Sequence, residues 1–196
     1  MRKFPIAIAA ALLPFASAQA TLIDFEDFGN VGISGPSVTN QYAGVLFSST
    51  GGQTNQVSSQ PGIGFGTNFI CTGTGAINCT GETLLDFSAP VSGLSFWAVG
   101  SDNAGDTARV DVFTNNVFAG TQVITTNGVF HTPNFVDLTS FSDVTRIRIY
   151  GITDGGGLGW DNFEFTPAVP EPATAALWLL GLAAVGGAAA RRRRGA

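Results

Sequence analysis

The sequence predicts an all-β fold, an antiparallel β-sandwich of the jelly-roll type. Short runs of Val, Ile, Phe, Leu and Thr alternate with polar residues at period two, and clusters of Gly, Asn, Asp, Ser and Pro separate these runs. Outside the two ends of the chain, no window keeps a helical period. About nine such runs at this spacing fit two packed sheets better than a barrel.

The clearest strand covers residues 145–150, where Ile147 and Ile149 face one way and Arg146, Arg148 and Tyr150 face the other. The tract 49–66 is rich in Gly, Ser, Gln and Asn and is expected to form an exposed loop. In chain order, the predicted strands are 22–28, 44–48, 83–87, 94–99, 108–113, 117–125, 134–138, 145–150 and 160–166.

Residues 1–20 are typical of a secretory signal peptide. Arg2 and Lys3 precede an apolar run over 4–15, and Ala18-Gln19-Ala20 forms a cleavage site of the A-x-A type. The run is too short for a membrane helix and contains two prolines. We therefore expect an exported protein.

The other end of the chain predicts a membrane segment with an orientation. Residues 173–190 are mostly apolar, and as a helix they would extend about 27 Å, just enough to cross a bilayer. Arg191, Arg192, Arg193 and Arg194 follow directly and should stay on the cytoplasmic side of the inner membrane. On hydropathy alone, this segment would be an ordinary C-terminal anchor.

The residues before this helix make the tail more specific. Val169, Pro170, Glu171 and Pro172, then the short helix, then the arginine cluster 191–194 together resemble the PEP-CTERM sorting signal, also known as the ice-binding protein C-terminal domain. The resemblance implies a bacterial envelope protein that an exosortase processes near the Pro-Glu-Pro motif. Such a chain would be anchored transiently, with its C-terminus in the cytoplasm, and then reach the cell surface or the extracellular space.

The resemblance also implies a setting, because proteins of this kind are associated with exopolysaccharide, biofilm or extracellular matrix. It specifies a route and no activity. Pro170 and Pro172 would keep the recognised residues 169–172 extended just outside the membrane.

Between the two ends, residues 21–168 have the size of one domain with a sizeable core. Their only basic residues are Arg109, Arg146 and Arg148, against 13 carboxylates, so the formal charge is about −10. A nucleic-acid partner is excluded because phosphate binding needs clustered cations. Divalent cations suit such a surface, although acidity also serves solubility.

Cys71 and Cys79 have seven residues between them, and an exported chain reaches an oxidising compartment. We therefore expect a disulfide. With His131 as the only histidine and no C-x-x-C spacing, a zinc site is disfavoured.

The ends of the domain offer oxygen ligands for a structural calcium ion. They loosely resemble the termini of jelly-roll carbohydrate-binding modules, in which calcium bridges the first and last strands. The resemblance places Asp24, Glu26, Asp161 and Asn162 at such a site, and these oxygens suit calcium. Alternatively, the carboxylates belong only to solvated strand faces and turns.

A second candidate site combines aromatic rings with polar groups, as sugar recognition requires. Trp97, Tyr150 and Trp160 could form a platform, because alternation allows Trp97 and Trp160 to face outward. Asp102 and Asn103 would supply polar contacts from a neighbouring loop. The competing interpretation is that these aromatic residues belong to the core.

These observations predict a non-catalytic protein that binds or is embedded in exopolysaccharide. The alternative class is a structural or adhesive surface protein without sugar recognition, and a glycan-active enzyme is the third. Catalysis by a serine nucleophile is disfavoured because no Gly-x-Ser-x-Gly sequence accompanies His131. Thirteen carboxylates leave open the acid pair of a glycoside hydrolase.

Overall fold

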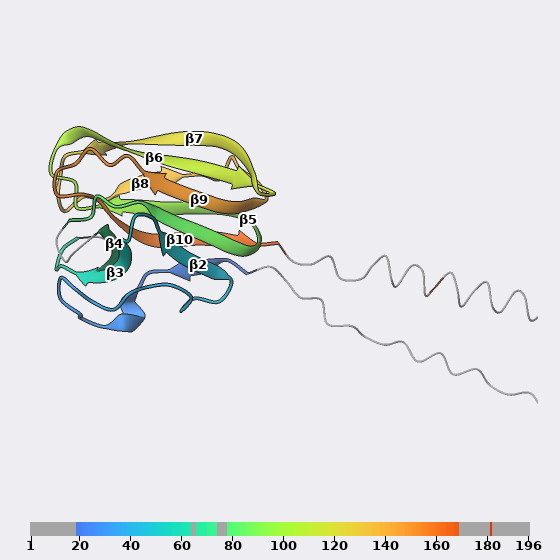
Figure 1. The fold of residues 1–196 in the computed structure, drawn as a ribbon, viewed down its shortest axis with the longest axis horizontal. Helices are drawn as coiled ribbons and strands as arrows, with labels where there is room; N and C mark the ends of the chain where they lie inside the picture. Colours follow the sequence, from blue (N-terminus) through green and yellow to red (C-terminus); the bar gives the residue numbers. More distant parts are fainter. Residues whose placement is uncertain (1–18, 64–65, 74–77, 169–180, 182–196) are drawn as a thin grey trace, which may run out of the picture. The chain divides into compact units, whose positions relative to one another are not determined.

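Ten antiparallel strands and one short 3-10 turn, η1 (Glu26–Phe28), make up the described part of the domain (Figure 1). The computed structural model describes residues 19–63, 66–73, 78–168 and Gly181. The strands are β1 (Thr21–Ile23), β2 (Val45–Ser49), β3 (Thr54–Ser59), β4 (Asn68–Gly73), β5 (Thr83–Val99), β6 (Ala104–Thr114), β7 (Val117–Asn127), β8 (Asn134–Asp137), β9 (Val144–Tyr150) and β10 (Gly159–Pro167).

Residues Gln19–Ala168 form one compact unit. The predicted signal peptide and the whole predicted sorting segment, including residues 173–190, lie outside the described residues except for Ala20, Gln19 and Gly181. Within the described part of the chain, no helix is long and apolar enough to cross a membrane.

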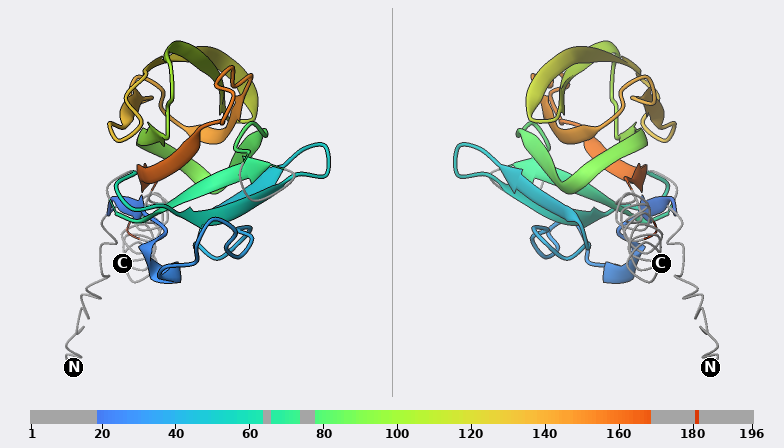
Figure 2. Two further views of the ribbon diagram at one scale, coloured as in Figure 1. Left: turned by 90° about the vertical axis from the view of Figure 1, so that its left-hand side faces the viewer. Right: turned by 90° about the vertical axis from the view of Figure 1, so that its right-hand side faces the viewer.

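Strand β5 organises the fold because its two halves pair with different neighbours. Its first half pairs with β2 and β9, and β6 and β7 extend the sheet beyond β9. Its second half pairs with β8 on one edge and with β10 on the other, where β4 and β3 follow. Figure 2 shows the strands β9, β6 and β7 curving away from the layer that contains β3 and β4. The predicted antiparallel all-β fold is confirmed: the strands join into one ten-stranded sheet through β5, which Figure 2 shows folded into two layers.

The core lies between these layers and is rich in aromatic rings. Phe25, Phe47, Phe96 and Phe163 are fully buried and contact one another edge-on or stacked. Burial of rings and branched aliphatic side chains of this kind supplies the main favourable term in folding.

The first and last strands of the domain pair with each other. Ile23 of β1 lies opposite Phe163 of β10, and both side chains are buried. The first strand is shorter than predicted, because Phe25 adopts a left-handed conformation (φ 59°) that turns the chain into η1. The predicted strands 83–87 and 94–99 are two halves of the single strand β5.

The predicted exposed loop at 49–66 is wrong. It contains β3, in which Asn55, Ser58 and Ser59 are buried although they are polar. Their side chains are satisfied by hydrogen bonds, for example from Ser58 to the Ile33 carbonyl (2.9 Å). Buried polar groups are tolerated when they are paired in this way. A strand that relies on such pairing has no hydrophobic alternation, so its pattern is typical of a loop.

Trp160 does not face outward, as the aromatic platform would require, and the competing interpretation that places it in the core is confirmed. Its side chain is fully buried, and its indole N–H donates to Thr83 Oγ1 (3.1 Å). The register of β10 against β5 shifts between Asp161 and Glu164, where Asn162 has a positive φ of 49°. A bulge of this kind breaks strict alternation, so Trp160 and Phe163 both face the core.

Candidate functional site

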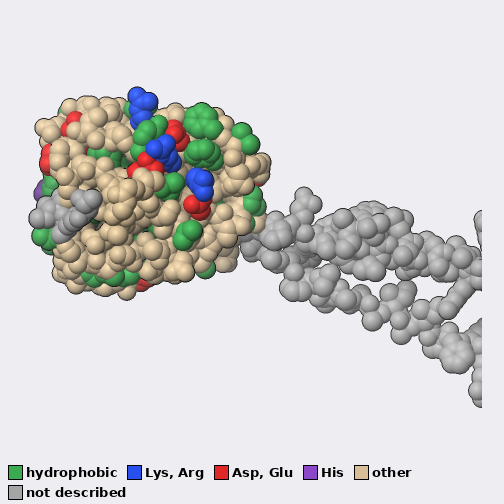
Figure 3. Space-filling model, in the orientation of Figure 1, with side chains coloured by type: hydrophobic (Ala, Val, Ile, Leu, Met, Phe, Trp, Pro, Cys, Tyr) green, Lys and Arg blue, Asp and Glu red, His purple; other side chains and the backbone are tan. Residues whose placement is uncertain are grey.

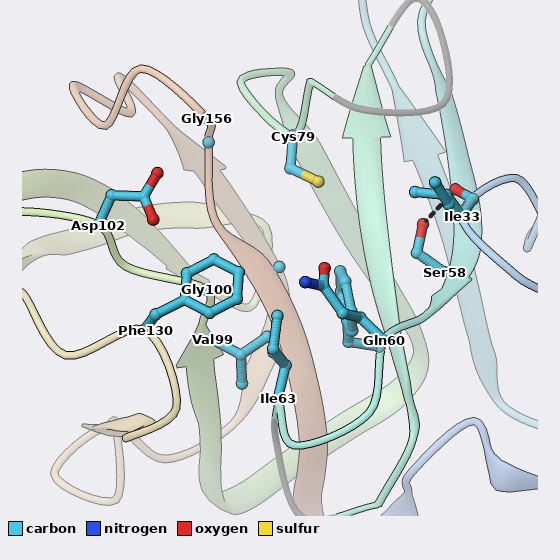
Figure 4. Close-up of a pocket in the computed structure, with 13 residues that line it drawn as sticks. Ile33, Ser58, Gln60, Ile63, Cys79, Val99, Gly100, Asp102, Phe130 and Gly156 are labelled. Atoms are coloured by element: carbon cyan, nitrogen blue, oxygen red, sulfur yellow. Dashed lines mark hydrogen bonds between the residues drawn. The ribbon is translucent and has the colours of Figure 1, made fainter.

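The described surface contains a cleft of about 280 Å³ where β5 ends and β10 begins (Figure 4). The opposite end of β10 leads to Ala168, the last described residue of this unit. The cleft is lined by Ile33, Ser58, Gln60, Ile63, Phe69, Cys79, Val99, Gly100, Asp102, Phe130, Gly156, Gly157 and Gly159.

A small second hydrophobic cluster forms the apolar part of the cleft. Ile63, Phe69, Cys71 and Val99 are its buried members. Trp97, Cys79 and Phe130 are partly buried against them. Phe130 and Phe69 therefore bring aromatic rings to the lining, in addition to the aliphatic side chains of Ile63 and Val99.

The predicted disulfide between Cys71 and Cys79 is confirmed and holds one wall of the cleft in place. The Cys79 N–H donates to the Gly156 carbonyl (3.2 Å), and the Leu158 N–H donates to the Cys79 carbonyl (3.1 Å). Gly157 has a φ of 85°, and a Cβ there would collide with the Cys79 backbone. Only glycine allows the two segments to approach so closely.

Asp154 fixes the loops on the opposite side. Its side chain is almost fully buried (1% exposed) and accepts hydrogen bonds from the backbone N–H groups of Asp102 (3.0 Å), Gly156 (2.9 Å) and Gly157 (3.1 Å). Hydrogen bonds to a carboxylate are stronger than those between neutral groups. The position of Asp102 at the cleft therefore depends on Asp154.

The remaining polar groups of the cleft are available to a ligand. Asp102 and Gln60 are exposed, and neither side chain forms a hydrogen bond to another described residue. In Figure 4 the Gln60 amide points toward Phe130, with Asp102 on the far side of the ring. His131 Nδ1 lies 2.8 Å from the Gly62 carbonyl, so the loop at 62–63 is joined to the segment that carries Phe130.

The structure separates the residues predicted to bind a glycan. Asp102 lines the cleft. Trp97 packs against the hydrophobic cluster that forms the apolar part of the cleft, and the centroids of the Trp97 and Phe135 rings lie 4.8 Å apart. Asn103 lies beside Asp102 but outside the cleft, where its carbonyl accepts a hydrogen bond from Thr126 (2.6 Å).

Trp160 and Tyr150 do not join this group. Trp160 belongs to the core. Tyr150 lies on β9, with the Arg148 guanidinium 4.4 Å from its ring centroid. One face of that ring is therefore already covered, and the three aromatic residues form no shared platform.

The sequence patterns did not predict Phe130 or Gln60 as residues of the site. Phe130 lies in a segment without alternation, between Gly128 and Pro133, and Gln60 lies within the tract expected to be a loop. The run Gly155-Gly156-Gly157 beside Asp154 was the one available signal of a close backbone approach.

The residues proposed for calcium have other partners. The Glu26 carboxylate accepts hydrogen bonds from the Thr67 and Asn68 N–H groups, both 2.8 Å. Asp24 accepts from the Glu26 N–H (3.2 Å), and buried Asp161 accepts from the N–H of Asn162 (2.7 Å). Within the described residues, no three His, Cys, Asp or Glu side chains are placed to hold a metal ion. Calcium at these positions stays a prediction, which melting curves with calcium and with chelator would test.

The three arginines of the domain lie on β6 and β9, and none of them lines the cleft. Arg146 pairs with Asp86 (2.5 Å) and Arg148 with Glu82 (2.6 Å) across neighbouring strands. Figure 3 shows basic, acidic and apolar side chains side by side on the face of the domain that carries these strands. Exposed ion pairs of this kind contribute little to stability.

Comparison with known proteins identifies the tail. Residues 168–194 match the family model described as the PEP-CTERM protein-sorting motif. The chain carries a PEP-CTERM sorting signal. This signal implies an exported protein that is sorted by an exosortase. No curated protein sequence matches the chain.

Two solved structures are similar to the domain at low sequence identity. One is the K1 cleaved adhesin domain of Lys-gingipain from Porphyromonas gingivalis W83, with 16% identity and a TM-score of 0.44, covering 77% of this chain and 99% of that chain. The other is an isomalto-dextranase of Arthrobacter globiformis T6 complexed with panose, with 13% identity and a TM-score of 0.37, covering 76% and 32%.

Proposed function

We propose that this exported domain is a non-catalytic glycan-binding module and that the cleft beside Asp102 and Phe130 is its binding site. The observation that carries the proposal is the composition of the cleft. An apolar lining with aromatic rings meets a rim on which Asp102 and Gln60 have free polar side chains. Sugars offer apolar faces to rings and hydroxyl groups to carboxylates and amides, so this combination suits them.

The size of the cleft favours a short part of a chain. At about 280 Å³, it lies at the lower limit of sites for small molecules, which begin near 300 Å³. We therefore propose recognition of a chain end or of one or two sugar units, in an exopolysaccharide that surrounds the producing cell.

The carboxylates near the cleft support a binding role over a catalytic one. Glycoside hydrolysis uses two carboxyl groups on either side of the scissile bond. Here Asp102 is free, but the oxygens of Asp154 accept three backbone hydrogen bonds and the residue is buried. Asp154 is thus an anchor for the loops, and one free carboxylate is too few for that mechanism.

The proposal is tested by affinity electrophoresis of the full chain in detergent, through gels that contain single polysaccharides. Phe130→Ala should abolish the retardation by the recognised glycan. Phe118→Ala removes a ring that is 56% exposed on β7 and should leave retardation unchanged. If no polysaccharide slows the wild-type chain, or if both variants behave alike, the cleft is not a glycan site.

A structural or adhesive protein is the second candidate, and one observation favours it. Val117, Phe118 and Val123 expose between 49% and 67% of their side chains on β7. Val117 and Phe118 are adjacent in the chain, and exposed apolar groups that lie close together are typical of surfaces that contact other proteins. Loss of cell-surface or matrix retention in Phe118→Ala, with normal retardation in the gels, would support this second function.

A further inference from the structure

The negative charge of the residues around the cleft favours some classes of glycan over others. Asp102 is the one charged residue among the described residues that line it. A Cβ built on Gly156 would lie 3.1 Å from Asp102 Oδ2 and 3.5 Å from Asp154 Oδ1, so both carboxylates lie close to the same glycine. The rim therefore holds two negative groups close together, of which only Asp102 is free to meet a ligand.

Among the described residues, no arginine, lysine or histidine lines the cleft beside Asp102. The arginines of residues 21–168 belong to β6 and β9, where Arg146 and Arg148 are paired with Asp86 and Glu82. The domain as a whole carries three arginines and 13 carboxylates. A surface with this balance attracts cations to a concave site and repels anions from it. An acidic sugar would bring a carboxylate or sulfate group next to Asp102, and no basic side chain in the lining would pair with that group.

We infer that the cleft recognises amino sugars whose amino groups are free, as in a deacetylated hexosamine polymer. This inference rests on the glycan-binding function proposed above. The ammonium group of such a sugar pairs with the Asp102 carboxylate in a charge-assisted hydrogen bond. The apolar face of the same ring packs on Phe130, and the Gln60 amide bonds to a hydroxyl group. Neutral sugars make the last two contacts and lack the first.

The test measures the affinity of the full chain in detergent for four probes by titration calorimetry. The probes are oligomers of glucosamine, N-acetylglucosamine, glucose and galacturonic acid of equal length. Glucosamine oligomers should bind at least about tenfold more tightly than the neutral ones, because a hydrogen bond to a charged group is stronger than one to a neutral group. Added salt should reduce this difference, and galacturonic acid oligomers should bind most weakly.

Two variants distinguish an effect of the carboxylate in the cleft from an effect of the overall negative charge of the domain. Asp102→Asn should abolish the preference for glucosamine, so that glucosamine oligomers bind no more tightly than the neutral oligomers. Asp143→Asn removes one exposed carboxylate at the start of β9, at a positive φ (55°) that asparagine tolerates, and should change nothing.

The possible failures differ. Equal affinity for glucosamine and N-acetylglucosamine oligomers, or an equal loss in both variants, overturns the amino-sugar inference and leaves the glycan-binding function standing. Preference for galacturonic acid overturns it as well. Absence of binding to all four probes, together with absence of retardation in the gels, overturns both proposals.

Discussion

Replacing Asp154 is the sharpest test of how the cleft is built. The carboxylate is buried and accepts three backbone hydrogen bonds, which place the segments at 102 and at 156–157. Asp154→Ala removes both acceptor oxygens and with them all three hydrogen bonds. The Gly157 N–H keeps a second acceptor, the Asp154 carbonyl (3.1 Å), and the partly buried N–H groups of Asp102 and Gly156 belong to exposed residues and can turn to water.

The magnitude follows from these partners. The N–H groups of Asp102 and Gly156 lose their acceptor, whereas that of Gly157 keeps one. At about 1.5 kcal/mol for each hydrogen bond to a charged group, the low end of the usual range, the loss should be about 3 kcal/mol of unfolding free energy. For a domain of this size, the melting temperature should then fall by roughly 5 to 15 °C. Asp154→Asn keeps an oxygen for Gly156 and Gly157 and should lose about half as much, because its amide nitrogen replaces the acceptor of the Asp102 N–H.

The assay is thermal unfolding of the full chain in detergent, followed by near-ultraviolet circular dichroism. Asp143→Asn is the matched control, since it removes an exposed carboxylate that has no hydrogen bond to another described residue. Asp154→Asn should also weaken glycan binding, while Asp143→Asn should not. If both Asp154 variants melt within about 1 °C of the wild type, Asp154 does not anchor the cleft and the reasoning is wrong.

Three further predictions concern the fold and the route. Burial, then the hydrogen bond to Asp27, raises the pKa of Tyr42 above its usual value. This stabilisation is complete below the unfolded pKa near 10 and declines as the pH rises past it, so Tyr42→Phe should melt with less pH dependence above about pH 10. Residues 21–168 contain no lysine, so no lysine of the domain titrates in the same pH range. Replacing Cys71 and Cys79 together by alanine should cost about 2 to 3 kcal/mol in denaturant unfolding, because the closed loop is short, and an unchanged midpoint would contradict this. In a host without exosortase, the mass of the exported chain should still include the C-terminal segment, and equal processing there would make the segment a plain anchor.

Local patterns predicted those features that depend on neighbouring residues. Alternation identified the buried faces of β9 and of the terminal strands, with Ile147, Ile149, Ile23 and Phe163 inside. It failed at Trp160, because one bulge at Asn162 reverses the parity. It also failed at β3, where hydrogen bonds to distant segments stabilise buried Asn55 and Ser58. Periodicity cannot report a partner that lies elsewhere in the chain.

The sequence alone determined the sorting route, the all-β class and the disulfide, because a sorting motif, period-two alternation and a close cysteine pair are all contiguous signals. The tertiary structure alone decided the cleft. Its lining comes from segments around residues 60, 102, 130 and 156, which become neighbours only when β5, β10 and the disulfide bring their ends together. The free carboxylate of Asp102, its buried anchor Asp154 and the ring of Phe130 meet through backbone hydrogen bonds and long-range strand pairing, and no local pattern encodes that meeting.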